Sequence, residues 1–174
     1  MPQPFPVFCM KALSVVFGCM VGLLSFAQAQ RPFGDACLGT WTGTMYIYRQ
    51  GAVKDSVPVR HTVARTADPN AWTWKTEYLS PKHPVVKDYV LRLKDPAKGI
   101  YVTDEGNGIE LADHLFGNKL YSVFETQGIV LTATYELSGN QLIFEVTSGR
   151  KQAAASQEVT TFSVDNLQRV VFRR

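Results

Sequence analysis

The sequence predicts an all-β protein, folded as an antiparallel up-and-down β-barrel of roughly 8–10 strands. After residue 38, apolar and polar residues alternate with a period of two through most of the chain, which is typical of strands with one buried face. Turn-forming sequences interrupt these runs at short intervals. No segment shows a strong helical period, and the best helical candidate, residues 109–119, contains Gly117.

The first element, residues 1–29, is expected to be a secretory signal peptide. Lys11 is its one charged residue, and an apolar run, residues 12–26, follows it. The run ends in Ala27-Gln28-Ala29, a small-x-small cleavage pattern. A transmembrane anchor is the alternative, but the run is shorter than the roughly 20 residues that span a bilayer. Cleavage predicts an exported protein, periplasmic or secreted, with no membrane span.

Cleavage leaves residues 30–174 as one domain that contains a single cysteine, Cys37. Because one cysteine cannot form an internal disulfide, Cys37 is expected to be a small buried hydrophobe. Lipid anchoring through Cys19 or Cys37 is a minority alternative. The 18 basic and 15 acidic residues of the chain are scattered and nearly balanced, so no nucleic-acid partner is expected.

The alternating runs follow one another along the domain. Their apolar, inward-facing members are, in order, Trp41, Met45 and Ile47; Trp72, Trp74 and Tyr78; Tyr89, Leu91 and Leu93; Ile129, Leu131, Ala133, Tyr135 and Leu137; and Leu142, Phe144 and Val146. Between them lie tight reversals at residues 68–70, 95–99, 106–108, 138–140 and 165–166. Residues 151–157 are expected to form a longer hairpin loop. Short connections favour a closed meander over an immunoglobulin-type sandwich, which needs longer crossing connections.

The first strand of the domain begins with Gly39-Thr40-Trp41. This triplet resembles the G-x-W start of the calycin superfamily, which includes lipocalins and fatty-acid-binding proteins; no subfamily is assigned. The resemblance implies a lipocalin-like barrel with one end closed by Gly39 and Trp41, and a basic residue near the last strand lying across the tryptophan. Arg169 and Arg173 are the candidates for that residue. It also implies a cavity for an apolar or amphipathic small molecule.

The candidate cavity wall consists of inward-facing aromatic residues and one histidine. These residues are Trp72, Trp74, Tyr78, Tyr89, Tyr135 and His61. Each could instead belong to a packed core, since a barrel of about eight strands either holds one small ligand or is filled by its own side chains. A packed core is the more frequent role for any single one of them.

The three histidines, His61, His83 and His114, have no metal-ligand spacing, so no metal site is expected. Nitrobindin-like barrels hold haem through a histidine on a late strand, and the chain has no histidine after His114; no cofactor is expected. Asp113-His114 could orient an imidazole for general-base chemistry. However, no nucleophile motif accompanies it.

Three functions follow from these observations. The first is an exported, non-catalytic, lipocalin-like protein that binds a small apolar or amphipathic molecule. The second is a filled barrel that binds protein or glycan through its surface, with Tyr46, Tyr48, Tyr101 and Tyr121 as the exposed aromatics to inspect. The third, given least weight, is an enzyme that uses His61 or His114. The sequence leaves the identity of the ligand and the oligomeric state open.

Overall fold

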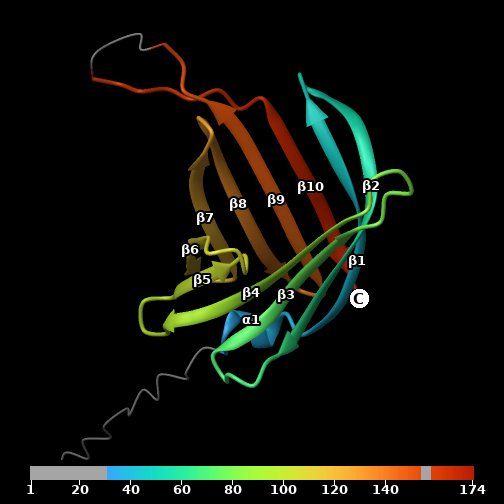
Figure 1. Cartoon of the computed structure of the whole chain (residues 1–174), viewed down its shortest axis with the longest axis vertical. Helices are drawn as coiled ribbons and strands as arrows, with labels where there is room; N and C mark the ends of the chain where they lie inside the picture. Colours follow the sequence, from blue (N-terminus) through green and yellow to red (C-terminus); the bar gives the residue numbers. More distant parts are fainter. Residues whose placement is uncertain (1–30, 154–157) are drawn as a thin grey trace, which may run out of the picture. The chain divides into compact units, whose positions relative to one another are not determined.

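Ten antiparallel strands close into a barrel in the computed structural model, which describes residues 31–153 and 158–174 (Figure 1). The elements are α1 (Phe33–Ala36), β1 (Gly39–Arg49), β2 (Ala52–Arg65), β3 (Ala71–Tyr78), β4 (Val85–Asp95), β5 (Ile100–Asp104), β6 (Glu110–Phe116), β7 (Lys119–Thr126), β8 (Ile129–Ser138), β9 (Gln141–Arg150) and β10 (Asn166–Arg173). The predicted all-β, up-and-down barrel is therefore confirmed.

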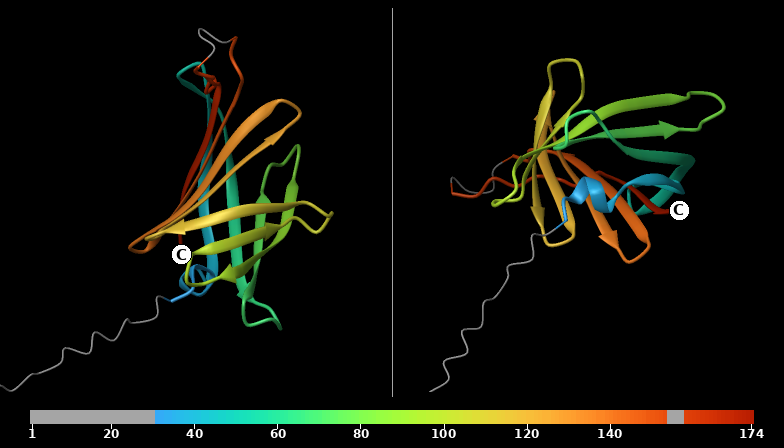
Figure 2. Two further views of the ribbon diagram at one scale, coloured as in Figure 1. Left: turned by 90° about the vertical axis from the view of Figure 1, so that its left-hand side faces the viewer. Right: turned by 90° about the horizontal axis from the view of Figure 1, so that it is seen from below.

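Each strand pairs with the next in the chain, and β1 also pairs with β10. The closing register places Met45 opposite Val170 and Tyr46 opposite Arg169. Every strand therefore has two neighbours, although β4 pairs with β5 only from Val90 onward. The two further views show how the strands tilt across one another as the sheet closes (Figure 2).

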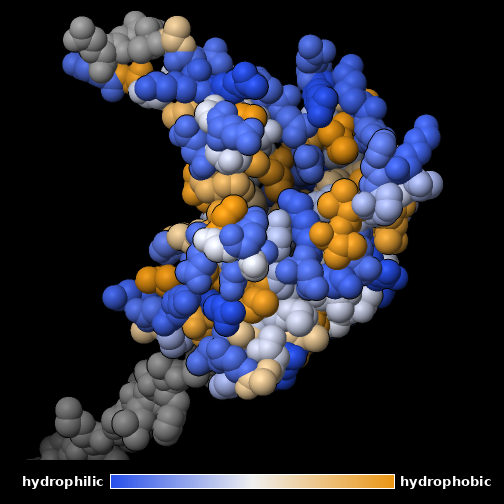
Figure 3. Space-filling view, in the orientation of Figure 1, coloured by the Kyte–Doolittle hydropathy of each residue, from blue (hydrophilic) through white to orange (hydrophobic). Residues whose placement is uncertain are grey.

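The period-two alternation of the sequence determines which side chains enter the barrel. Along β1, Trp41 and Met45 are buried, whereas Thr40, Thr42 and Thr44 are exposed on the outer surface. In the space-filling view, hydrophobic side chains line the recess between the two sides of the barrel, and hydrophilic residues cover much of the face that is turned to the viewer (Figure 3). The buried apolar residues form one cluster: Phe33, Cys37, Trp41, Met45, Val59, Val63, Trp72, Trp74, Leu91, Tyr101, Leu120, Leu142, Phe144, Val170 and Phe172.

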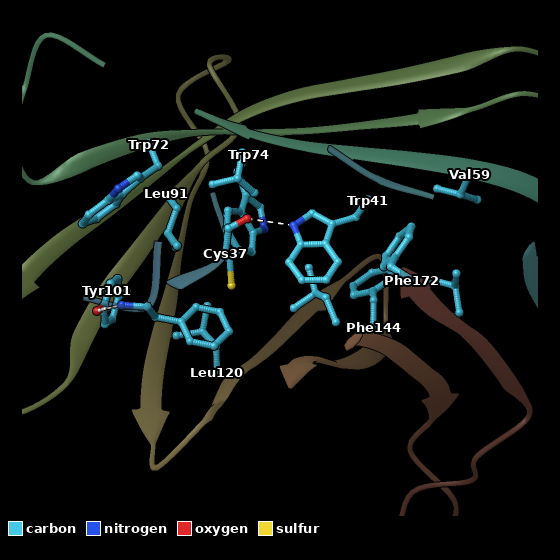
Figure 4. Packing of buried hydrophobic residues seen from close by; sticks show 14 of the residues in the cluster. Cys37, Trp41, Val59, Trp72, Trp74, Leu91, Tyr101, Leu120, Phe144 and Phe172 are labelled. Atoms are coloured by element: carbon cyan, nitrogen blue, oxygen red, sulfur yellow. Dashed lines mark hydrogen bonds between the residues drawn. The ribbon is translucent and has the colours of Figure 1, made fainter. Parts of the chain in front are cut away.

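The short helix α1 lies across one end of the barrel, where β1 begins and β10 ends (Figures 1 and 2). The indole nitrogen of Trp72 donates a hydrogen bond to Asp35 Oδ1 at 2.8 Å, and the ring packs against Gly34. The backbone N–H of Phe33 donates to the Tyr101 hydroxyl at 2.9 Å (Figure 4). These contacts close this end of the barrel.

Trp41 seals the same end from inside. It is fully buried, and its Nε1 donates to the carbonyl of Cys37 at 2.7 Å (Figure 4). Gly39, two residues earlier, has φ +121°, a backbone conformation that side-chain-bearing residues rarely adopt. Cys37 is buried, as expected, and burial raises the pKa of its thiol to about 12.

The arginine that covers Trp41 is Arg174, whose guanidinium carbon lies 4.2 Å from the centroid of the indole ring. The sequence-based assignment to Arg169 or Arg173 was wrong. Along β10 these two residues alternate with the inward-facing Val170 and Phe172, so they point outward, and Arg169 pairs there with Glu145. Arg174 follows the last residue of the strand, so its side chain can fold over the barrel end.

Two further expectations need correction. Residues 109–119 are not helical, because Glu110–Phe116 forms β6, paired with β5 and β7. Tyr101 is not a surface residue, since it is 2% exposed and packs beneath α1. The predicted leader, residues 1–29, and residues 154–157 of the predicted loop lie outside the described residues. No helix in the described ranges is long and apolar enough to cross a membrane.

Candidate functional site

A cavity of about 120 Å³ lies inside the barrel, toward the end opposite α1. This position follows from the strand directions: the cavity is lined by the later half of β3 and the earlier half of β4, which lie away from the closed end. Its lining residues are Trp74, Thr76, Tyr78, Lys87, Tyr89, Thr103, Glu105, Leu111, Asp113, Leu120, Ser122, Phe124, Leu131, Ala133, Tyr135, Phe144 and Val146. All of them come from β3 to β9 or, for Glu105, from the residue after β5.

Aromatic rings form much of the cavity wall. The ring centroids of Trp74 and Tyr135 are 5.0 Å apart in an edge-to-face arrangement, and those of Tyr135 and Phe144 are 4.4 Å apart and stacked. Such contacts between rings fix their orientation and stabilise the wall. Burial raises the pKa of both Tyr78 and Tyr135, so both hydroxyls are neutral and available as hydrogen-bond donors at neutral pH.

A carboxyl group lies within this apolar wall. Asp113 on β6 is 3% exposed, and its Oδ2 accepts a hydrogen bond of 2.7 Å from Thr103 Oγ1 on β5. Burial is the largest influence on Asp113 and raises its pKa, whereas hydrogen bonds from Thr103 and Ser122 act in the opposite direction. A buried carboxyl in a cavity with a perturbed pKa is a feature that binding and catalytic sites often share.

Charged residues of both signs stand at the solvent side of the cavity. Lys87 is exposed and its Nζ lies 5.8 Å from the ring centroid of Tyr89. Burial, followed by the neighbouring carboxylate of Glu105, raises the pKa of Tyr89 to about 12. The mouth of the cavity can therefore contact either a positive or a negative group of a ligand.

One donor in the cavity wall is poorly paired. The Nε1–H of Trp74 is buried and has no hydrogen bond of good geometry among the described residues, although the Tyr135 hydroxyl lies close enough to interact with it. An unpaired buried N–H costs stability, because its hydrogen bonds to water are lost without replacement. Trp74 lines the cavity, so a ligand with an acceptor atom could satisfy this group.

Four of the six predicted wall residues line the cavity: Trp74, Tyr78, Tyr89 and Tyr135. Whether they contact a ligand stays a prediction. Trp72 has a different place, since it is buried at the closed end beneath α1, where it bonds to Asp35.

His61 is inside the barrel but is buried against the cavity wall rather than forming its surface. It is 0% exposed, its Nδ1 lies 2.9 Å from Thr76 Oγ1, and its ring meets Trp74 edge-on. Burial lowers its pKa to about 3, so the imidazole is neutral. His114 is exposed on the outer face of β6 and stacks on Phe116, whereas the neighbouring Asp113 points inward. Asp113 and His114 therefore lie on opposite faces and cannot act as a pair.

Sequence reasoning considered Asp113 only as a partner of His114, and it missed the other polar residues of the site, namely Thr103, Ser122, Lys87 and Glu105. The signal was present in the alternation of Leu111, Asp113 and Leu115, which shares one face when residues 110–116 are a strand. Interpreting that segment as a candidate helix concealed it.

The described residues also form a larger recess of about 910 Å³, between the β1–β2 hairpin and the segment that leads into β10. It opens broadly to solvent and has mostly exposed walls, including Arg49, Gln50 and Lys54. The smaller cavity is the better candidate site, because core side chains enclose it and buried polar groups converge on it.

Comparison with known proteins places the fold. No protein-family model and no curated protein sequence matches the chain. The S-type phycobiliprotein lyase CPES from Guillardia theta superposes with a TM-score of 0.58 at 8% identity, covering 82% of this chain and 90% of the lyase. The structure of Rv2717c from M. tuberculosis superposes with a TM-score of 0.51 at 16% identity, covering 83% of this chain and 98% of that one. At these identities the likeness concerns the fold alone, and it agrees with the predicted barrel.

Proposed function

We propose that this barrel is an exported, non-catalytic protein that binds a small apolar or amphipathic molecule in its internal cavity. The observation that carries the proposal is the cavity itself, with its aromatic wall and a buried carboxyl. Binding sites for small molecules typically combine such a mostly apolar concave surface with a few convergent polar groups. The fold supports the proposal without identifying the ligand, because barrels of this type host many functions.

The volume of the cavity limits the ligand. Cavities that hold drug-sized molecules measure about 300–1,000 Å³, whereas this one measures about 120 Å³. A cavity of roughly 150 Å³ accommodates benzene in an engineered protein. The buried part of the ligand is therefore about the size of one ring, and any longer part must extend past Lys87 and Glu105 into solvent.

Native mass spectrometry of the protein purified from the cells that make it tests this proposal. We expect a reproducible extra mass that disappears on denaturation and that is recovered by extraction as a small organic molecule. A bare protein mass, together with no uptake of ring-sized apolar compounds, would contradict the proposal and favour the filled barrel that binds through its surface. N-terminal sequencing of the same sample tests export, with Gln30 expected as the first residue.

A further inference from the structure

Asp113 is a buried carboxyl with no cationic partner. Among the described residues, the ion pairs join Arg60, Arg65, Lys75, Arg92, Lys98, Lys119 and Arg169 to other acids, and none includes Asp113. Its hydrogen bonds come from the hydroxyl group of Thr103, at 2.7 Å, and from the backbone N–H of the same residue. Burying an ionised carboxylate without a positive partner is costly, and burial accordingly raises the pKa of Asp113. A positive group supplied by a ligand would favour the ionised form.

Asp113 lies where a ligand could provide the positively charged hydrogen-bond donor that the protein does not supply. The residue lines the cavity, and a carboxylate has about four lone-pair sites, so the hydrogen bonds from Thr103 leave capacity for a further donor. A positively charged donor would make the strongest bond there and would also neutralise the buried charge. Since the Thr103 hydroxyl holds Asp113 before a ligand arrives, the carboxylate is already oriented.

The remainder of the wall also suits a cation. Six aromatic side chains surround the cavity: Trp74, Tyr78, Tyr89, Phe124, Tyr135 and Phe144. The faces of such rings carry partial negative charge and attract ammonium groups. Lys87 and Glu105 have opposite charges at the mouth, whereas the inner part of the cavity has one carboxyl group and aromatic rings. The inner part thus favours a protonated amine on an apolar body over a neutral or an acidic molecule.

We propose that the cavity selects small amines and that Asp113 binds the ammonium group, while the aromatic wall contacts the apolar body. The inference rests on the proposed function, because it names the chemical class of the ligand for that cavity. It also fits the volume of about 120 Å³, which has room for one ring and a short substituent.

Calorimetric titration with three probes of similar size and different charge tests the assignment. The probes are benzylamine, benzyl alcohol and benzoate, and the protein is the full chain as purified. In the wild type we expect benzylamine to bind roughly tenfold or more tightly than benzyl alcohol, since a hydrogen bond to a charged group is stronger than a neutral one. Benzoate is expected to bind most weakly, because its charge repels Asp113.

The variant Asp113→Asn removes the charge and keeps the shape. It is expected to weaken benzylamine binding by about tenfold to a hundredfold and to leave benzyl alcohol binding unchanged. The matched control Asp88→Asn makes the same substitution at an exposed position of β4, on the outer face, and should change neither affinity.

The outcomes separate the two proposals. If benzylamine and benzyl alcohol bind equally well and Asp113→Asn changes neither, the amine assignment is overturned while the cavity remains a small-molecule site. If none of the three probes binds, both the assignment and the ring-sized cavity are overturned. The comparison of the three probes on wild-type protein decides the matter even if Asp113→Asn does not fold.

Discussion

Arg174 provides the most specific prediction about stability. Its guanidinium lies 4.2 Å from the ring centroid of Trp41, and its Nη2 donates to the carbonyl of Ala36 at 3.2 Å. The side chain therefore joins the end of the chain to both the sealing tryptophan and the helix α1. Arg173, its neighbour, is an exposed residue on the outer face of β10. Comparing the stability of variants at Arg174 and at Arg173 therefore distinguishes the loss of these contacts from the loss of one positive charge.

The expected magnitude follows from the two contacts that Arg174→Ala removes. A cation–π contact at an exposed position contributes about 0.5–1 kcal/mol, and a hydrogen bond contributes about 0.5–1.5 kcal/mol. We expect Arg174→Ala to lower the free energy of unfolding by about 1–2 kcal/mol. This corresponds to a fall in Tm of roughly 3–7 °C for a domain of this size. Arg173→Ala should stay within about 0.5 kcal/mol of the wild type.

Urea denaturation followed by tryptophan fluorescence and by circular dichroism measures both variants. Arg174→Lys should fall between Arg174→Ala and the wild type, because lysine keeps the charge but loses the planar stack on the indole. The reasoning would be refuted by equal stability losses for Arg173→Ala and Arg174→Ala, or by no loss in Arg174→Ala.

Three other predictions concern the closed end and the buried titratable groups. Gly34→Ala should lower the free energy of unfolding by about 1–3 kcal/mol in a urea titration, because its Cβ would overlap the indole ring of Trp72; unchanged stability would show that α1 can shift freely. His61 binds a proton less readily when folded, with a pKa of about 3, so stability should fall as the pH drops from about 6.5 toward 3, by at most about 1.4 kcal/mol per pH unit from this group. Thermal unfolding of His61→Gln against pH should show a shallower acid decline, and an identical slope would contradict the neutral, buried imidazole. Asp113 has the opposite effect on the pH dependence of stability, because folding raises its pKa. Its contribution to the free energy of unfolding falls as the pH rises from its unfolded-state pKa through its folded-state pKa, so Asp113→Asn should be more stable relative to wild type at pH 7 than at pH 4. A relative stability that does not change with pH would count against the raised pKa.

The barrel could be predicted from the sequence because its signal is local. Each strand alternates along its own length, and short turns allow only neighbouring strands to pair. The exception was β6, whose inward-facing Leu111 and Leu115 are four residues apart. That spacing fits one face of a helix as well as one face of a strand, so the pattern alone could not distinguish them.

The site was only partly predictable, because alternation gives the face of a residue but not its depth along the barrel. Trp72 and Trp74 share the inner face of β3, yet one contacts α1 and the other lines the cavity. The difference comes from the register, in which Trp72 lies opposite Arg65 at the end of β2. To place a residue along the barrel axis, one must know how the strands pair and where the helix α1 lies. Neither can be inferred from the sequence of one strand.

The most direct test of the central claim is to fill the cavity. Ala133 lines it, and Ala133→Leu would occupy much of its volume of about 120 Å³, whereas Ala64→Leu makes the same change at an exposed position of β2. Native mass spectra of the wild type and both variants, purified alike, would be compared for the mass that leaves on denaturation. We predict that the bound mass persists in the wild type and in Ala64→Leu and disappears in folded Ala133→Leu. Equal bound mass in folded samples of all three would contradict a ligand site inside the barrel.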